Sequence, residues 1–146
     1  MAGFDSKIAI DKPIHEVYHA FLDRQRMKHW LSGFQTIELL HGTNNAVGSR
    51  YKLTMLENGH EICLDQEITV NDENQEFAFT MEHETMTSHS RVRFIPLNNH
   101  ATEVWLTVEI HGKGRLWKFI IPTMVPLIQK RQETDLLKFK TMLESS

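Results

Sequence analysis

The sequence predicts an α+β fold, in which a curved antiparallel sheet of about seven strands wraps around a long C-terminal helix and two short helices follow the first strand. Three observations predict it. Apolar residues recur at intervals of three and four between Arg115 and Glu144, the spacing that lines one face of a helix. From residue 34 to residue 111 the chain instead alternates apolar and polar residues in short segments, which is typical of strands. The turns between these segments are short, and short turns favour antiparallel neighbours.

The N-terminal part predicts one strand and two short helices. The first strand is expected over residues 6–10, where apolar residues alternate. Asp11 and Pro13 then supply a helix start, with Asp11 as the cap and Pro13 in the first turn. A second short helix is expected over residues 24–31, and it ends at Ser32-Gly33.

The remaining strands form a continuous series with turn residues between them. The strongest hairpin signal is Asn58-Gly59, a pair that suits a two-residue turn. The clean alternation means that one face of the sheet is packed and the other is wetted, as with Val104 and Leu106 against Glu103 and Trp105. The expected strands span residues 34–40, 48–56, 61–70, 75–82, 86–95 and 102–110.

The C-terminal helix contains two prolines, Pro122 and Pro126. Each proline removes a backbone donor and crowds the preceding turn, at a cost of about 3 kcal/mol in a regular helix. We therefore expect a break or kink near Pro122, with a regular helix over residues 123–144 and a separate turn over residues 117–121. This turn either gates a cavity under the helix or marks a static bend.

Length, charge and cysteine content exclude several classes of protein. The 146 residues contain no repeat or linker, so we expect a single domain over residues 1–146. The formal net charge is −3 without a cationic cluster, so no nucleic-acid partner is expected. No apolar run approaches the ~20 residues that cross a bilayer, and the first residues lack the features of a secretory signal. The single cysteine, Cys63, excludes an internal disulfide. We expect a cytoplasmic monomer or homodimer without a membrane span or cofactor.

The order of these elements resembles the helix-grip fold of the START/Bet v 1-like (SRPBCC) superfamily, of the polyketide cyclase/dehydrase and lipid-transport type. The resemblance extends over nearly the whole chain and is carried by residues 8–18, 27–30, 47–49, 102–104 and 135–144. It implies a hydrophobic cavity between the sheet and the long helix. It transfers no catalytic residue, because no catalytic motif of the group matches here.

His83 is the most informative single candidate residue. Its position in the strand pattern places it on the same face as Phe79 and Met81, which directs it toward the expected cavity. There it could bind a ligand carboxylate or carbonyl, or act as a general base, because imidazole gains and loses a proton near neutral pH. The alternative is a half-exposed histidine at a strand end, bonded to water or to a backbone carbonyl.

Other polar residues share strand faces that are otherwise apolar. Gln66, Ser88 and Ser90 are the clearest cases. A buried polar group must be hydrogen-bonded or wet, so these residues either line a cavity or mark a bulge that shifts the alternation. The complete set of candidate ligand-binding residues is Trp30, Tyr51, Leu53, Gln66, Phe79, Met81, His83, Ser88, Ser90, Phe119, Ile120 and Met124.

The nine histidines do not predict a metal site. His15 and His19 share a helix face but lack an acidic third ligand, and His83 and His89 fall on opposite strand faces. Cys63 shares its strand face with Glu61, Asp65 and Glu67 and is expected to be exposed beside these carboxylates, which argues against a nucleophilic role.

Three functions from different classes stay open. The first is binding or carriage of a small hydrophobic or amphipathic molecule in the cavity, which the architecture favours. The second is a cyclase- or dehydratase-like enzyme in which His83 moves protons within the cavity. The third is an interaction module like the chaperone activators of the superfamily, which would use the outer face of the sheet around Trp105.

Overall fold

The computed structural model describes residues 2–145 of the chain. In chain order, the elements are β1 (Ala2–Ile10), α1 (Ile14–Leu22), the 3-10 turn η1 (Arg24–Arg26), α2 (Met27–Trp30), β2 (Phe34–His41), β3 (Arg50–Glu57), β4 (His60–Asp72), β5 (Glu76–Glu82), β6 (Met86–Pro96), β7 (Thr102–Gly112) and α3 (Gly114–Glu144). The seven strands form one antiparallel sheet in the order β1-β7-β6-β5-β4-β3-β2. The α+β helix-grip architecture that the sequence predicts is therefore confirmed.

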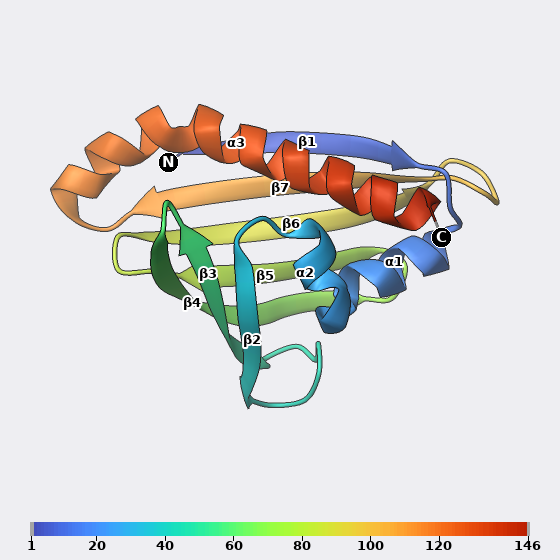
Figure 1. The fold of residues 1–146 in the computed structure, drawn as a ribbon, viewed down its shortest axis with the longest axis horizontal. Coiled ribbons are helices and arrows are strands. Elements are labelled where there is room, and N and C mark those ends of the chain that lie inside the picture. Colours follow the sequence, from blue (N-terminus) through green and yellow to red (C-terminus); the bar gives the residue numbers. More distant parts are fainter. Residues whose placement is uncertain (1, 146) are drawn as a thin grey trace.

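The three helices lie on one face of the sheet (Figure 1). In this view β2 and β3 run at a steep angle to β5, β6 and β7, so the sheet curves around the helical layer. The long helix α3 crosses over β1 and β7, and its C-terminal end lies near α1. The curvature places the inner faces of the middle strands opposite α3.

The alternation in β7 shows which face is packed. Val104, Leu106 and Val108 are at most 5% exposed, whereas Trp105 between them is 39% exposed. Alternate side chains of a strand point to opposite faces, so the inner face of the sheet is buried and the outer face is wetted, as expected.

Two features of the N-terminal part differ from the sequence prediction. The strand β1 begins at Ala2 and pairs with β7 along its whole length, so it extends four residues before the expected start at Ser6. Asp11 does not cap α1. The helix follows directly from Pro13, whose carbonyl accepts from the backbone N–H groups of Glu16 and Val17. The capping prediction was wrong because the N-cap position belongs to Pro13, two residues after Asp11.

The helix α3 is continuous through both prolines, so the separate turn predicted over residues 117–121 is wrong. Pro122 and Pro126 both lie on the exposed side of the helix, where water can bond the carbonyls that lose their helical donors. The axis bends in its N-terminal part rather than breaking (Figure 1).

Two glycines fix tight connections. Asn58 and Gly59 both have positive φ, as a primed two-residue turn requires, and they join β3 to β4 as predicted. Gly112 ends β7, where a Cβ atom would overlap the backbone of Trp117 in the first turns of α3. Only glycine permits the helix to approach the sheet this closely.

An aromatic cluster forms the core at the α1 end of the helical layer. The ring of Phe139 on α3 lies 5.5 Å from Phe21 and 5.1 Å from Trp30, measured between ring centroids. Phe21 also meets Phe94 at 5.8 Å. Most of these pairs adopt edge-to-face geometry, which adds about 0.5–1.5 kcal/mol per pair beyond the burial of their area.

Candidate functional site

A cavity of about 470 Å³ lies between the sheet and α3. Its walls come from η1 and α2, from the inner faces of β3 to β7, and from one side of α3. The helix contributes Trp117, Ile121, Met124 and Ile128, whose spacing of three and four residues keeps them on one face. The side chains of sheet and helix therefore do not fill the enclosed space, and most of its lining is apolar.

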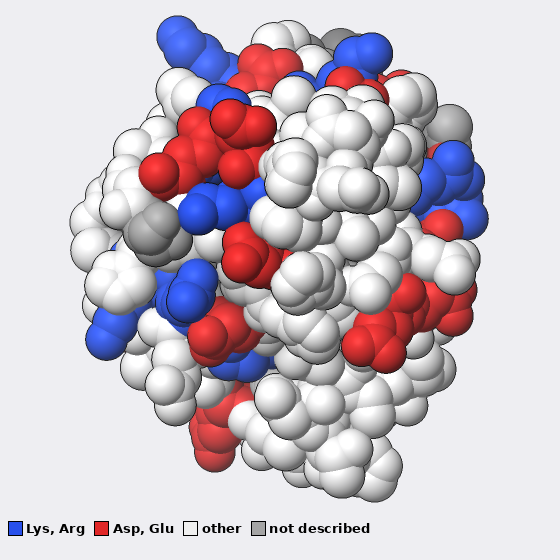
Figure 2. Space-filling view, turned by 90° about the vertical axis from the view of Figure 1, so that its right-hand side faces the viewer, with Lys and Arg blue, Asp and Glu red and all other residues white. Residues whose placement is uncertain are grey.

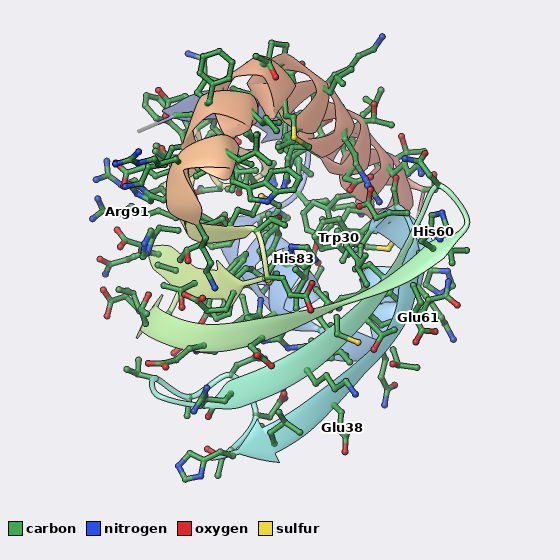
Figure 3. All side chains as sticks on the ribbon, turned by 90° about the vertical axis from the view of Figure 1, so that its left-hand side faces the viewer. Trp30, Glu38, His60, Glu61, His83 and Arg91 are labelled. Atoms are coloured by element: carbon green, nitrogen blue, oxygen red, sulfur yellow. The ribbon has the colours of Figure 1, made fainter. Side chains whose placement is uncertain are left out.

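Figure 3 shows the end of the molecule at which α3 begins. Trp30 and His83 lie within the space that the sheet and α3 enclose. Glu38 and Arg91 point away from it. The cavity reaches toward this end, because Ile62, Thr85 and Met86 contribute to its wall.

The polar residues of the sheet wall lie on neighbouring rows. Gln66 pairs with Met81 across β4 and β5, and Met81 pairs with Ser88 across β5 and β6. Ser90 opposes Phe79 in the next row. These side chains share the cavity face, so the alternation of the sequence, rather than a bulge, explains their positions.

Nine of the twelve candidate residues lie on the cavity wall. They are Trp30, Leu53, Gln66, Phe79, Met81, His83, Ser88, Ser90 and Met124. Their position on the wall does not show that they contact a ligand, so the binding role of these nine residues stays a prediction.

Three candidates lie elsewhere, which corrects the predicted site. Phe119 is 80% exposed, and Ile120 is half-buried outside the cavity wall. Both lie in residues 117–121, where a separate turn over the cavity was expected. The continuous helix directs Trp117 and Ile121 inward instead. Tyr51 is buried but does not belong to the cavity wall, and the guanidinium of Arg24 lies over its ring.

His83 lies just after the end of β5. Its backbone N–H donates to the carbonyl of Met86, and its Nδ1 lies 3.0 Å from the hydroxyl of Thr85. The imidazole is half-buried and borders the cavity. The tight connection between β5 and β6 therefore holds the ring at the cavity wall, where it can accept or donate a hydrogen bond.

Arg24 is a charged cavity residue that the sequence pattern did not indicate. Its Nε donates to Asn45 Oδ1 at 3.0 Å, and its Nη1 donates to Gln66 Oε1 at 3.0 Å. The guanidinium lies 4.2 Å from the centroid of the Tyr51 ring. Burial lowers the pKa of Arg24 from its usual value. The residue borders the cavity and also a polar hollow of about 740 Å³ on the outside, next to α1 and the loop at Asn44.

The outer hollow is larger than the internal cavity but is a weaker candidate site. Its wall consists mainly of polar side chains, including His19, Gln25 and Glu73. Such a lining keeps water rather than displacing it for an apolar molecule. The internal cavity is therefore the better candidate for a ligand.

A second polar group joins α2 to α3 at the cavity edge. Asp135 is 4% exposed and accepts hydrogen bonds from the backbone N–H and the hydroxyl of Ser32. Burial raises the pKa of the Asp135 carboxyl, and the Ser32 hydrogen bonds partly oppose that shift. Arg131 donates to the Ser32 carbonyl and pairs with Glu57. The cluster fixes the position of α3 over the cavity.

The outer face of the sheet carries mixed charges. Trp105 donates from its indole nitrogen to Glu103, and the ammonium of Lys7 lies 5.2 Å from its ring centroid. Figure 2 shows a different side, the end of the molecule at which α3 ends; there Lys and Arg lie next to Asp and Glu on one side, and a broad area carries neither. Within residues 2–145, no three His, Cys, Asp or Glu side chains are grouped so as to hold a metal ion. Within the same residues, no helix has the length and apolar character needed to span a membrane.

A curved sheet that grips a long helix over an apolar cavity defines a class of proteins that enclose small molecules. The sequence belongs to the family described as polyketide cyclase/dehydrase and lipid transport, whose model matches residues 1–144. With its structural neighbours, this match places the chain in the START/Bet v 1-like superfamily, as the sequence predicts. No curated protein matches the sequence significantly.

Solved structures share the fold at low sequence identity. A Thermus thermophilus protein is 20% identical, with a TM-score of 0.79 and coverage of 99% of both chains. The Zhui aromatase/cyclase from a Streptomyces species is 11% identical, with a TM-score of 0.79 and coverage of 97% of this chain and 93% of that one. A START superfamily protein from Mycobacterium smegmatis is 13% identical, with a TM-score of 0.69 and coverage of 94% and 99%. At these identities the similarity establishes the fold and leaves the ligand open.

Proposed function

We propose that the protein binds or carries a small hydrophobic or amphipathic molecule in the cavity between the sheet and α3. The observation that supports this proposal is the apolar cavity of about 470 Å³, a volume within the range of small-molecule pockets. Burial of apolar ligand surface supplies about 25 cal/mol per Å² as the main driving force. Gln66, His83, Ser88 and Ser90 are the polar groups available to orient the molecule.

A neutral fluorescent probe such as Nile red tests this proposal. The substitution Met124→Lys places a charge on the cavity wall and is expected to reduce probe affinity at least about tenfold, since a buried unpaired charge is strongly unfavourable. Phe119→Lys is the matched control. It adds the same charge to the same helix at a side chain that is 80% exposed, and it should leave binding unchanged. Equal binding by both variants would refute a ligand in this cavity.

A second candidate function is catalysis of a cyclisation or dehydration. The family description and the aromatase/cyclase among the structural neighbours favour it. His83 would be the proton-transferring group, because its imidazole borders the cavity next to Thr85. Turnover of a polyketide-like substrate should then disappear in His83→Ala while Nile red binding persists. Undiminished turnover in that variant would exclude this role.

The proposed carrier would act in the cytoplasm. Cys63 is a free, exposed thiol, and unpaired thiols persist in reducing compartments. A monomer or homodimer without nucleic-acid partners is the proposed state, and light scattering of the purified protein, with and without DNA, measures both.

A further inference from the structure

Arg24 is a half-buried residue, and the hydrogen-bond partners of its guanidinium among the described residues are neutral. Among the described residues, Asn45, Gln66 and the sulfur of Met27 bond its Nε and Nη1, and Tyr51 covers one face. None of these groups is a carboxylate, and no salt bridge of Arg24 is found in the described chain. The remaining nitrogen, Nη2, is buried and has no partner there.

Such an arrangement is energetically unusual. Charged side chains away from water are normally paired, and an unpaired buried donor forfeits its hydrogen bond to water without replacement. The Tyr51 ring and the amide oxygens of Asn45 and Gln66 hold the guanidinium in one place while leaving both N–H bonds of Nη2 unused. The group is therefore positioned in advance for an acceptor that the protein does not supply.

A second donor on the same short helical segment is also unpaired. Trp30 Nε1 is buried, lacks a partner among the described residues, and belongs to the cavity wall. Arg24, Met27 and Trp30 are spaced by three residues along η1 and α2, and all three line the cavity. Arg24 and Trp30 therefore both line the cavity, and each keeps a buried nitrogen donor without a partner among the described residues.

We propose that the cavity selects amphipathic carboxylates, with the carboxylate accepting hydrogen bonds from Arg24 Nη2 and the apolar part extending toward Met81, Met124 and Trp117. Arginine is the side chain best suited to a planar carboxylate, because its fork of donors matches the two oxygens. Trp30 Nε1 is a second donor for the polar end of the ligand. This inference depends on the proposed function and adds the chemical class of the ligand.

Paired ligands that differ only in their head group test it. Decanoic acid and decanol compete with Nile red for wild-type protein, for Arg24→Met and for Arg24→Lys. Arg24→Met retains length and apolar contacts but removes the charge. We expect the preference for the acid over the alcohol to fall about tenfold to a hundredfold in Arg24→Met, the usual worth of a charge-assisted hydrogen bond. Arg24→Lys should retain part of the preference.

The outcomes separate the two proposals. Failure of Nile red, decanoic acid and decanol to bind wild-type protein would overturn the proposed function itself. Binding of all three with the same acid preference in wild type and Arg24→Met would overturn only the carboxylate assignment.

A measurement on wild-type protein keeps the test valid if Arg24→Met does not fold. As pH falls through the pKa of decanoic acid, the affinity for the acid should decrease relative to decanol, because the ligand loses its charge. Simple partition into an apolar cavity predicts the opposite, since the neutral acid is more hydrophobic. A relative affinity that rises on acidification would therefore refute the role of Arg24.

Discussion

The two halves of α3 differ in how deeply their apolar side chains are buried against the domain. In its C-terminal half, Leu136, Phe139 and Leu143 are at most 4% exposed and pack against neighbouring side chains. In its N-terminal half, Ile121 is the one fully buried apolar residue, while Phe119 and Leu127 face solvent at 80% and 71%. The prolines also lie in this half.

This difference shows how one helix can both stabilise a domain and cover a cavity. The C-terminal half packs against aromatic rings from α1 and α2, and dense packing contributes most to stability. The N-terminal half faces the hollow between the layers, where flexible residues such as Met81, Met86 and Met124 form much of the lining. Methionine adapts its shape readily, so this wall is less rigid than the aromatic core.

The largest expected effect tests the packed half. Phe139→Ala should lower the free energy of unfolding by about 3–5 kcal/mol, the usual cost of deleting a buried aromatic ring. Met124→Ala, in the half that faces the cavity, should cost about 1 kcal/mol, because less packing is lost there. Urea unfolding followed by circular dichroism measures both. Equal losses would contradict the contrast between the halves.

A smaller effect is expected at the junction of the halves, where Asp135 binds Ser32. Burial raises the folded-state pKa of Asp135 above the ordinary value of 3.8. The folded state therefore holds this proton more tightly, so its contribution to stability is present below the unfolded pKa and is lost as pH rises through the folded pKa.

The substitution Asp135→Asn removes that titration and keeps an oxygen that can accept from Ser32. Stability of the variant relative to wild type should increase as pH rises from about 4 toward neutrality. Glu133→Gln, which removes an exposed carboxylate from the same helix, is the matched control. Stability curves of wild type and Asp135→Asn that stay parallel across this range would show that the burial of Asp135 has no such consequence.

The smallest expected effect is a difference in local opening along α3, and it is measured on the wild-type protein. Amides of residues 115–125 should exchange with solvent faster than those of residues 136–144, because the N-terminal half packs less and its prolines remove helical donors. Hydrogen exchange resolved by mass spectrometry measures the rates. Exchange in residues 115–125 as slow as in the central strands would identify the bend as static. It would refute the hypothesis that this segment gates the cavity.

Sequence alternation was sufficient for the sheet wall of the candidate site and insufficient for its helical parts. Gln66, Ser88 and Ser90 face the cavity because a period of two leaves no other choice in a half-buried strand. Phe119 and Ile120 were misplaced because the helical phase depends on whether the helix breaks at Pro122. The helix continues through Pro122 and Pro126 because both prolines face solvent.

Arg24 was missed for a different reason. Arginine is ordinarily a surface residue, and nothing in its immediate neighbours indicates burial. The available signal was its spacing of three and six residues from Met27 and Trp30, which places all three on one face of the short helical segment. The stack on Tyr51 depends on a contact between distant parts of the chain, which no local pattern reports.

The close approach at Gly112 has a consequence for how such proteins diversify. Because the backbone of Trp117 lies against this glycine, the angle between α3 and the sheet is set where the helix follows β7. A side chain at position 112 would push the start of α3 away from the sheet. The cavity beneath the helix would then be larger, although no residue of its wall had changed. The size of the cavity is thus adjustable from the rim of the sheet, independently of the residues that line it.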